Sequence, residues 1–214
     1  FLYPRSADLG LYIAIFTLMG AAGTSEIAAT LNVDGDTAVA AGLLLLLAIM
    51  GKSAQIPLQD WLMRAMAGPT PVSALLHSAT LVAAGAILLI RVAPLLTPEV
   101  LLAIGLVGGI TTVAAGLIAL AERDLKRLLA ASTASQYGLM LIAVGAGVPL
   151  AALLHLLAHA AIKSGLFLAA GEFQHARGGT ALERLRGVGR VRPWTFFGFA
   201  LAALALVGAP PLSG

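Results

Sequence analysis

The sequence predicts an all-α fold, a polytopic bundle of about seven transmembrane helices. Of the 214 residues, 59% are hydrophobic and only 11% are charged, against roughly 45–50% and about 25% in an ordinary soluble domain. The hydrophobic residues are grouped in runs, and a membrane-spanning helix takes about 20 mostly apolar residues. The composition therefore excludes a typical water-soluble globular protein.

Seven apolar runs follow one another along the chain. They lie at about 9–22, 37–57, 72–92, 100–121, 125–148, 150–170 and 194–209. The first run is short for a bilayer, whereas several of the others are rich in glycine and alanine, which lets neighbouring helices approach closely. We therefore expect one packed transmembrane domain over residues 1–214.

The loop charges predict an orientation, because Lys and Arg collect in cytoplasmic loops. Arg5 precedes the first run, three basic residues follow the fourth and five follow the sixth, all on one side. Glu26, Asp34 and Asp36 lie in a loop on the other side. We expect a multi-pass protein of the cell (inner) membrane with residue 1 on the cytoplasmic side.

The chain has no cysteine and a formal net charge of +3. The absence of cysteine excludes thiolate metal sites, iron–sulfur clusters and thiol catalysis in this chain. The arginines lie in short loops between apolar runs and not on a basic face of a soluble scaffold, so no nucleic acid is expected as a partner.

Two lysines lie inside apolar runs, Lys52 in the second and Lys163 in the sixth. A lysine at the centre of a membrane helix costs about 2.5–3.5 kcal/mol and needs a partner, a hydrated cavity or access to the interface. His155, His159 and Lys163 are spaced i, i+4 and i+8, which places them in a stripe roughly 12 Å long on one helix face. Because an imidazole accepts a proton on one nitrogen and donates from the other, we interpret this stripe as a proton relay.

Prolines predict two breaks in the apolar runs. Pro57 follows a polar segment that starts at Lys52, and a proline removes a backbone donor, so we expect a helix break near residues 52–58. Pro210 and Pro211 predict a second break near residues 208–211. Broken membrane helices are tolerated only inside protein or beside water, and they form ion sites in transporters. Two breaks at comparable positions suggest an internal repeat.

Further polar side chains lie close to these features. His77 falls about two turns into the helix that follows Pro71, at a depth similar to that of Lys52 if the two helices are antiparallel neighbours. Ser132, Gln136 and Tyr137 add hydroxyl and amide groups to the fifth run. These groups either hold ordered water for the relay or join helices by hydrogen bonds.

Long motifs follow one another in order along nearly the whole chain. They are GKSAQIPL at 51–58, AMAGPTPVSALLH at 65–77, DLKRLLA at 124–130, Ser132-Thr133 with Ser135-Gln136, and His155, His159 and Lys163 followed by LFL at 166–168. Together they closely resemble the antiporter-like membrane subunits of respiratory complex I, above all the L-type (chain 5) family of NADH-quinone oxidoreductase.

The resemblance implies part of a proton-translocating subunit with two inverted repeats of five helices, each with a broken helix. It implies that Lys52 is a central proton-carrying site, that His77 connects half-channels, and that His155, His159 and Lys163 continue the hydrophilic axis. Asp8 falls where the family has an aspartate in an Asn-Arg-x-Gly-Asp motif, although residues 4–8 here read PRSAD.

The resemblance also implies the assembly around the chain. The expected partners are other membrane subunits of a complex I-like assembly, the lipid bilayer and protons. The chain would be a subunit of a translocase without a redox site or cofactor of its own, while flavin, iron–sulfur clusters and quinone belong to partner subunits. No metal site is expected in this chain.

Several other functions compete with this interpretation. A subunit of a multisubunit cation/proton (Na+/H+) antiporter, of a membrane-bound hydrogenase or of an inorganic-carbon-uptake complex shares the core motifs. A retinal protein with a Schiff base on Lys163 would need an aromatic cage, yet aromatic residues make up 6% of the chain. His155 and His159 could share a zinc ion or bind haem, but no further ligand is near. The polar residues could also be purely structural, with Lys52 snorkelling to the interface.

Overall fold

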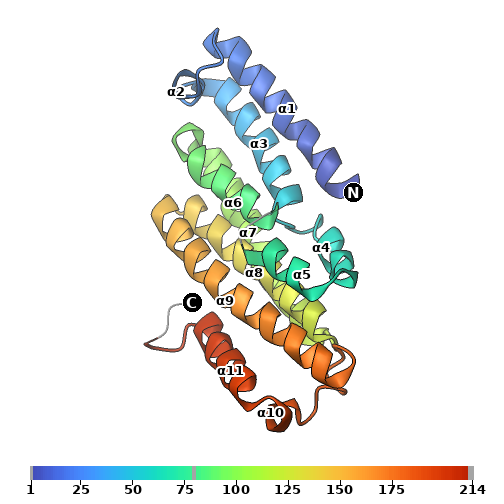
Figure 1. The fold of residues 1–214 in the computed structure, drawn as a ribbon. Helices are drawn as coiled ribbons and strands as arrows, with labels where there is room; N and C mark the ends of the chain where they lie inside the picture. Colours follow the sequence, from blue (N-terminus) through green and yellow to red (C-terminus); the bar gives the residue numbers. More distant parts are fainter. Residues whose placement is uncertain (1, 79–80, 212–214) are drawn as a thin grey trace.

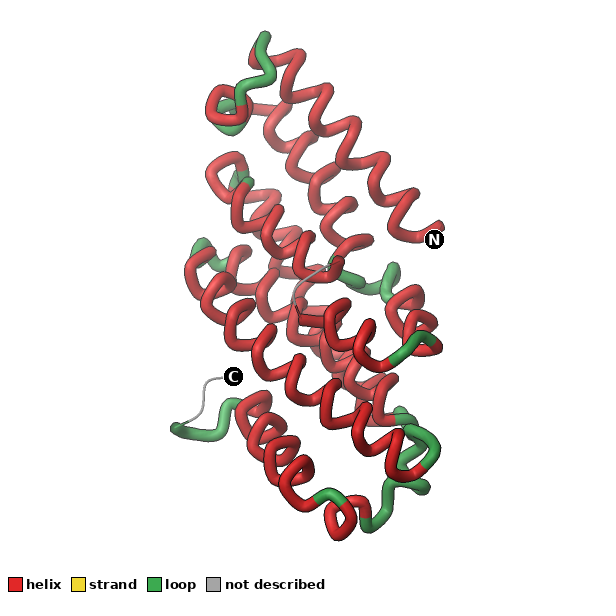
Figure 2. Tube along the Cα trace, in the orientation of Figure 1, coloured by secondary structure: helices red, strands yellow, loops and turns green. Residues whose placement is uncertain are grey.

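The computed structural model describes residues 2–78 and 81–211. In these ranges the chain is helical apart from short turns and one isolated bridge between Asp124 and Ala181 (Figures 1 and 2). The helices are α1 (Leu2–Ala22), α2 (Ile27–Thr30), α3 (Gly35–Lys52), α4 (Asp60–Arg64), α5 (Thr70–Ser78), α6 (Leu81–Arg91), α7 (Pro98–Ala121), α8 (Leu125–Gly145), α9 (Pro149–Arg177), α10 (Val188–Val191) and α11 (Pro193–Val207). The predicted all-α class is confirmed for this part of the chain.

Five candidate membrane spans stand out by length and hydropathy. They are α3, the segment Thr70–Arg91 that contains α5 and α6, and the helices α7, α8 and α9. The sequence predicts about seven. The first predicted run lies in α1, which carries Arg5 and Asp8 in its first half, and the last lies in α11, which has only 15 residues. The charges of α1 and the shortness of α11 separate these two helices from the five candidate spans. With five spans, the chain is a multi-pass integral membrane protein.

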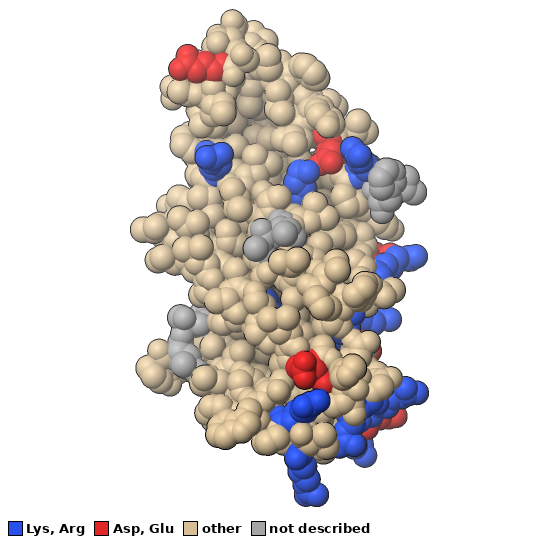
Figure 3. Space-filling model, viewed as in Figure 1, with Lys and Arg blue, Asp and Glu red and all other residues tan. Residues whose placement is uncertain are grey.

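The outer surface of α7 has the pattern of a helix that faces lipid. Its large apolar side chains recur every three or four residues and are 58–84% exposed: Leu102, Leu106, Ile110, Val113, Leu117 and Leu120. Figure 3 shows that most of the visible surface is uncharged and that Lys and Arg gather toward one end of the molecule. A continuous apolar surface of this kind fits a bilayer and not water.

Small residues bring α7 and α8 together. A Cβ atom added to Gly138 of α8 would lie 2.7 Å from the carbonyl oxygen of Gly108 on α7, and one added to Gly145 would lie 2.8 Å from Cα of Gly105. The hydroxyl of Ser135 donates to the carbonyl of Thr112 at 2.8 Å. Close backbone approach with hydrogen bonds across the interface is how membrane helices associate.

The chain leaves the helix after α3 and enters α4 only at Asp60. Neighbouring helices bind the polar groups of the segment between them. Ser53 Oγ donates to the carbonyl of Val82 on α6 at 2.9 Å, and the backbone N–H of Ile56 donates to Thr111 Oγ1 on α7 at 3.1 Å. The protein thus supplies the partners that irregular backbone needs at membrane depth.

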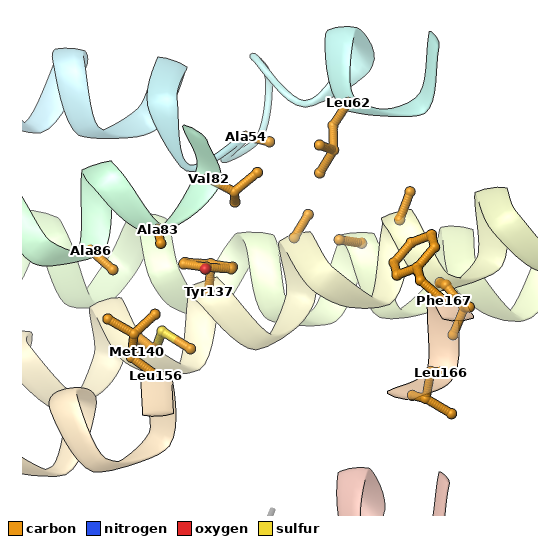
Figure 4. Packing of buried hydrophobic residues seen from close by; sticks show 14 of the residues in the cluster. Ala54, Leu62, Val82, Ala83, Ala86, Tyr137, Met140, Leu156, Leu166 and Phe167 are labelled. Atoms are coloured by element: carbon orange, nitrogen blue, oxygen red, sulfur yellow. The ribbon is translucent and has the colours of Figure 1, made fainter. Parts of the chain in front are cut away.

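The buried core lies between α6, α8 and α9. Figure 4 shows Tyr137 of α8 close to Val82 and Ala83 of α6, with Phe167 of α9 farther along the same layer. Figure 1 shows the pair α1–α3 on one side of this core and α11 on the other, against α9. The core positions the inward faces of α8 and α9, which carry the polar stripe.

Candidate functional site

Lys52 forms an ion pair with Asp8. Lys52 is the last residue of α3, and its Nζ atom lies 2.6 Å from Oδ1 of Asp8 on α1. The side chains of Lys52 and Asp8 are 20% and 18% exposed. The local sequence explains the approach, because a Cβ added to the neighbouring Gly51 would lie 2.2 Å from Cβ of Ala7. Glycine at position 51 thus lets α1 come close enough for the ion pair to form.

Lys163 is fully buried in the middle of α9. Its ammonium group donates to the carbonyl oxygen of Leu129 at 2.9 Å and to the hydroxyl of Ser132, both on α8. The side chain therefore ends inside the helix bundle and does not snorkel. Ser132, a candidate from the sequence, is a direct partner of the predicted relay lysine.

His155 and His159 lie on the same face of α9 as Lys163. The ring nitrogen Nε2 of His155 lies 2.8 Å from Oε1 of Gln136. The ring of His159 meets the ring of Tyr137 edge-on, with the centroids 5.4 Å apart, and lies 6.1 Å from the ring of His155. Since α8 and α9 are antiparallel neighbours, Ser132 lies beside Lys163 toward one end of the stripe and Gln136 beside His155 at the other.

His77 of α5 lies against the opposite part of the same core. Its ring is fully buried and stacks on Phe167 of α9, with 4.4 Å between the centroids and 15° between the planes. Phe167 follows Lys163 by one helical turn, so the stack places His77 next to the stripe.

Several buried polar atoms of this site have no hydrogen-bond partner among the described residues. They are both ring nitrogens of His77, both ring nitrogens of His159 and the hydroxyl of Tyr137. A buried polar group left unpaired costs about 1–3 kcal/mol, and native proteins satisfy such groups with ordered water. The arrangement therefore has the chemistry of a hydrated site.

Sequence reasoning missed Lys126. The loop charges place it with Arg123 and Arg127 among the three basic residues that follow the fourth apolar run, but α8 begins at Leu125 and Lys126 is only 4% exposed. Its Nζ donates to the carbonyl of Gly68 at 2.6 Å, in the turn that precedes α5. The signal available in the sequence was Asp124, whose carboxylate caps α8 through the N–H of Arg127. A cap at 124 starts the helix before the lysine.

The proline segments lie at different distances from these residues. Pro57 lies in the non-helical segment directly after Lys52. The chain leaves α11 after Val207, where Gly208 has a φ of 76°, and Pro210 and Pro211 follow. No cluster of three or more His, Asp or Glu side chains suited to a metal ion occurs in residues 2–78 and 81–211.

Comparison with known proteins gives a family match over the whole chain. Residues 1–214 match the family described as "NADH:quinone oxidoreductase/Mrp antiporter, TM". The chain is 43% identical over 224 residues to NADH-quinone oxidoreductase subunit L of Mycobacterium tuberculosis, covering all of this chain and 35% of that protein. It is 44% identical over 211 residues to NADH-ubiquinone oxidoreductase chain 5 of Yarrowia lipolytica, covering 96% and 32%. The chain thus spans about a third of the length of the curated relatives it matches.

Solved structures share the fold. The Mrp complex from Dietzia sp. DQ12-45-1b superposes with a TM-score of 0.87 at 35% identity, covering 98% of this chain and 24% of that one. The membrane-bound sulfane sulfur reductase, an archaeal respiratory membrane complex, superposes with a TM-score of 0.84 at 26% identity, covering 98% and 45%. These matches confirm the resemblance that the sequence motifs indicate.

Proposed function

The chain belongs to the NADH:quinone oxidoreductase/Mrp antiporter transmembrane family, and from this premise we propose that it translocates protons as part of an L-type membrane subunit of an NADH-quinone oxidoreductase. The proton path comprises the Asp8–Lys52 pair, His77, and the stripe of His155, His159 and Lys163. Electron transfer takes place in partner subunits, which hold the flavin, iron–sulfur clusters and quinone.

One observation carries the proposal: His77, His159 and Lys163 are all buried at 1% exposure or less within membrane helices. Apolar residues of similar size would make a more stable core at such positions, because burying ionisable groups is costly. The ring nitrogens of His77 and His159 and the hydroxyl of Tyr137 have no partner among the described residues, which adds to that cost. Expensive, ionisable groups on one layer of a bundle are typical of a proton pathway.

The geometry suggests how a proton moves along α9. The ammonium of Lys163 already donates two hydrogen bonds, so its third proton is available to a water molecule on the side of His159. No direct hydrogen bond joins His159 to His155 or to Tyr137, and single waters between them complete the relay. Gln136 then holds the ring of His155 in a fixed orientation at the end of the stripe.

The Asp8–Lys52 pair acts as the control point of the path. While the carboxylate lies 2.6 Å from the ammonium, the ion pair keeps the side chain of Lys52 turned toward α1. Opening the pair frees the ammonium to turn toward His77. Charge or conformational changes elsewhere in the assembly drive the opening.

Residues Ser132, Gln136 and Tyr137 support the relay. Pro57 keeps the polar segment after Lys52 out of a helix, and Pro210 and Pro211 do the same after α11. We propose that α1 and α11 belong to the membrane domain as well, which gives seven spans, and that the two breaks belong to two inverted repeats of the complete subunit. Its partners are other membrane subunits, and the residue 1 end faces the cytoplasm of a cell (inner) membrane.

A second candidate is cation/proton exchange in a multisubunit antiporter. The 35% identity to a chain of the Mrp complex favours it. Sodium prefers oxygen ligands, and the stripe on α9 offers imidazole and ammonium groups. Proton transfer therefore fits the side chains better, although an antiporter moves protons through the same groups.

The test uses the full-length subunit in its purified complex, reconstituted into vesicles. Replacing Lys163 by Met keeps most of the side-chain volume and removes the ammonium. We expect protons translocated per NADH oxidised to fall severalfold, while Ser164→Ala, one position along and bonded only to its own helix at Ala160, leaves the ratio unchanged. An unchanged ratio in both Lys163→Met and Lys52→Met would overturn the proposal. Sodium uptake that persists without NADH would favour the antiporter.

A further inference from the structure

The connection between α9 and α11, residues 178–192, is attached to the helix bundle at several points. It pairs with the α7–α8 connection: the N–H of Leu182 donates to the carbonyl of Arg123, and the N–H of Leu125 donates to the carbonyl of Thr180, both at 2.9 Å. The side chains of Leu185 and Val188 are buried in the main core. Hydrogen bonds therefore hold the backbone at residues 180–182, and buried side chains hold it at residues 185 and 188.

Arginines cover the outer side of this connection. The exposed basic residues of 177–192 are Arg177, Arg184, Arg186, Arg190 and Arg192. We call this set the arginine platform; Glu183 is the one acidic residue in the same stretch. Figure 3 shows blue side chains gathered at the end of the molecule where α10 lies in Figure 1.

The backbone of the connection packs against two of these arginines. A Cβ added to Gly179 would lie 3.3 Å from Nη1 of Arg184, and one added to Gly187 would lie 3.4 Å from Nη2 of Arg177. The two guanidinium groups thus lie against opposite ends of the connection. These contacts place two of the five positive charges along the connection.

The platform lies at the ends of the membrane helices. It begins where α9 ends, lies beside the start of α8, and ends at Arg192, directly before α11. Directly next to it, Val191 is 54% exposed, Trp194 85% and Phe197 64%. Exposed aromatic side chains next to arginines are typical of the membrane–water interface, where the phosphate groups of lipids lie.

We propose that the arginine platform binds the phosphate groups of anionic phospholipids. A guanidinium group forms paired hydrogen bonds with phosphate oxygens, and several basic residues near a membrane surface attract anionic lipids. The apolar residues that follow the platform favour lipid over an acidic protein segment, because Trp194 and Phe197 then contact the acyl chains of the bound lipids. This site is separate from the proton path and does not depend on it.

The test measures lipid binding to the complete complex in a neutral detergent. Short-chain phosphatidylglycerol is titrated into the complex, bound lipid is counted by native mass spectrometry, and phosphatidylcholine serves as the uncharged comparison. Each arginine near an anionic surface contributes a factor of about five in affinity. We expect the triple variant Arg186→Gln, Arg190→Gln, Arg192→Gln to bind phosphatidylglycerol about a hundredfold more weakly, with phosphatidylcholine binding unchanged.

The control is Arg91→Gln, which removes an exposed arginine from the end of α6, outside the platform. We expect its affinity for phosphatidylglycerol to stay within twofold of the parent. The melting temperature and subunit composition of the triple variant should match those of the parent. Wild-type phosphatidylglycerol binding in the triple variant would overturn the proposal. So would loss of a partner subunit with lipid binding intact, which would assign the platform to a protein interface, or full competition by millimolar inorganic phosphate at constant ionic strength.

Discussion

The contact between Gly51 and Ala7 makes a specific prediction about the Asp8–Lys52 pair. A Cβ atom at position 51 would lie 2.2 Å from Cβ of Ala7, whereas ordinary contact begins at 3.4 Å. In Gly51→Ala the two helices must therefore separate by about 1.2 Å at this level. Because Asp8 and Lys52 are the next residues along each helix, their 2.6 Å contact opens to about 3.8 Å, beyond hydrogen-bonding distance.

The expected result is a loss of proton translocation without loss of the complex. Overpacking of this kind costs about 1–3 kcal/mol, which α1 and α3 can absorb by moving apart. Gly51→Ala should lower protons translocated per NADH oxidised in vesicles to the level of Asp8→Asn, and combining the two substitutions should add no further loss. Both effects have the same cause, the broken ion pair.

A compensating substitution makes the reasoning refutable. In Ala7→Gly with Gly51→Ala, the clashing Cβ is gone and the new one meets its next neighbours at 3.6 Å or more, so the ratio should return toward that of the parent. The matched control is Gly20→Ala on helix α1. A Cβ at position 20 meets nothing within 4 Å. If the double variant stays impaired, or if Gly51→Ala translocates normally while Asp8→Asn does not, the steric argument is wrong.

Three further outcomes follow from the contacts of α8. Ser132→Ala removes one of the two acceptors of the Lys163 ammonium, and a hydrogen bond to a charged group is worth about 1.5–3 kcal/mol. We expect proton uptake by vesicles to slow about tenfold or more, and unchanged uptake would contradict a role of Ser132 in the relay. Tyr137→Phe removes a buried hydroxyl without a protein partner and should slow uptake while leaving the melting temperature within a few degrees; equal uptake would exclude the hydroxyl from the relay. Gly138→Ala places a Cβ 2.5 Å from Thr112 Oγ1 and should destabilise the purified complex by about 1–3 kcal/mol in thermal melting, unlike Gly116→Ala, whose nearest contact is 3.6 Å.

The sequence predicted what depends on local spacing. His155, His159 and Lys163 are four residues apart, and any helix places such residues on one face. The all-α class follows equally directly from the apolar runs. The number of spans does not follow from the runs alone, because α1 is a helix of the right length with charges in its first half, and a run of apolar residues cannot distinguish α11 from a full span.

The sequence could not predict which side chains meet. Lys163 contacts Ser132 across 31 positions, and Lys126 contacts Gly68 across 58. Asp8 was singled out only by its place in a motif, and nothing local indicates that Gly51 brings it to Lys52. The stack of His77 on Phe167 is also missing from any spacing pattern. Such pairs are set by how whole helices pack, and packing depends on small residues scattered through all of them.

The stack on Phe167 also fixes the orientation of the His77 ring. The two ring nitrogens lie in the plane of the imidazole, so with the phenyl ring 4.4 Å away on one face they point sideways and not into the phenyl ring. Turning the ring over to exchange the two nitrogens would swing its edge into the phenyl ring and lose the stacking energy, about 0.5–1.5 kcal/mol. On the path proposed above, a proton that enters at one nitrogen leaves by the other. The uncharged ring of Phe167 thus orients His77 so that its two nitrogens serve separate steps of the proposed path.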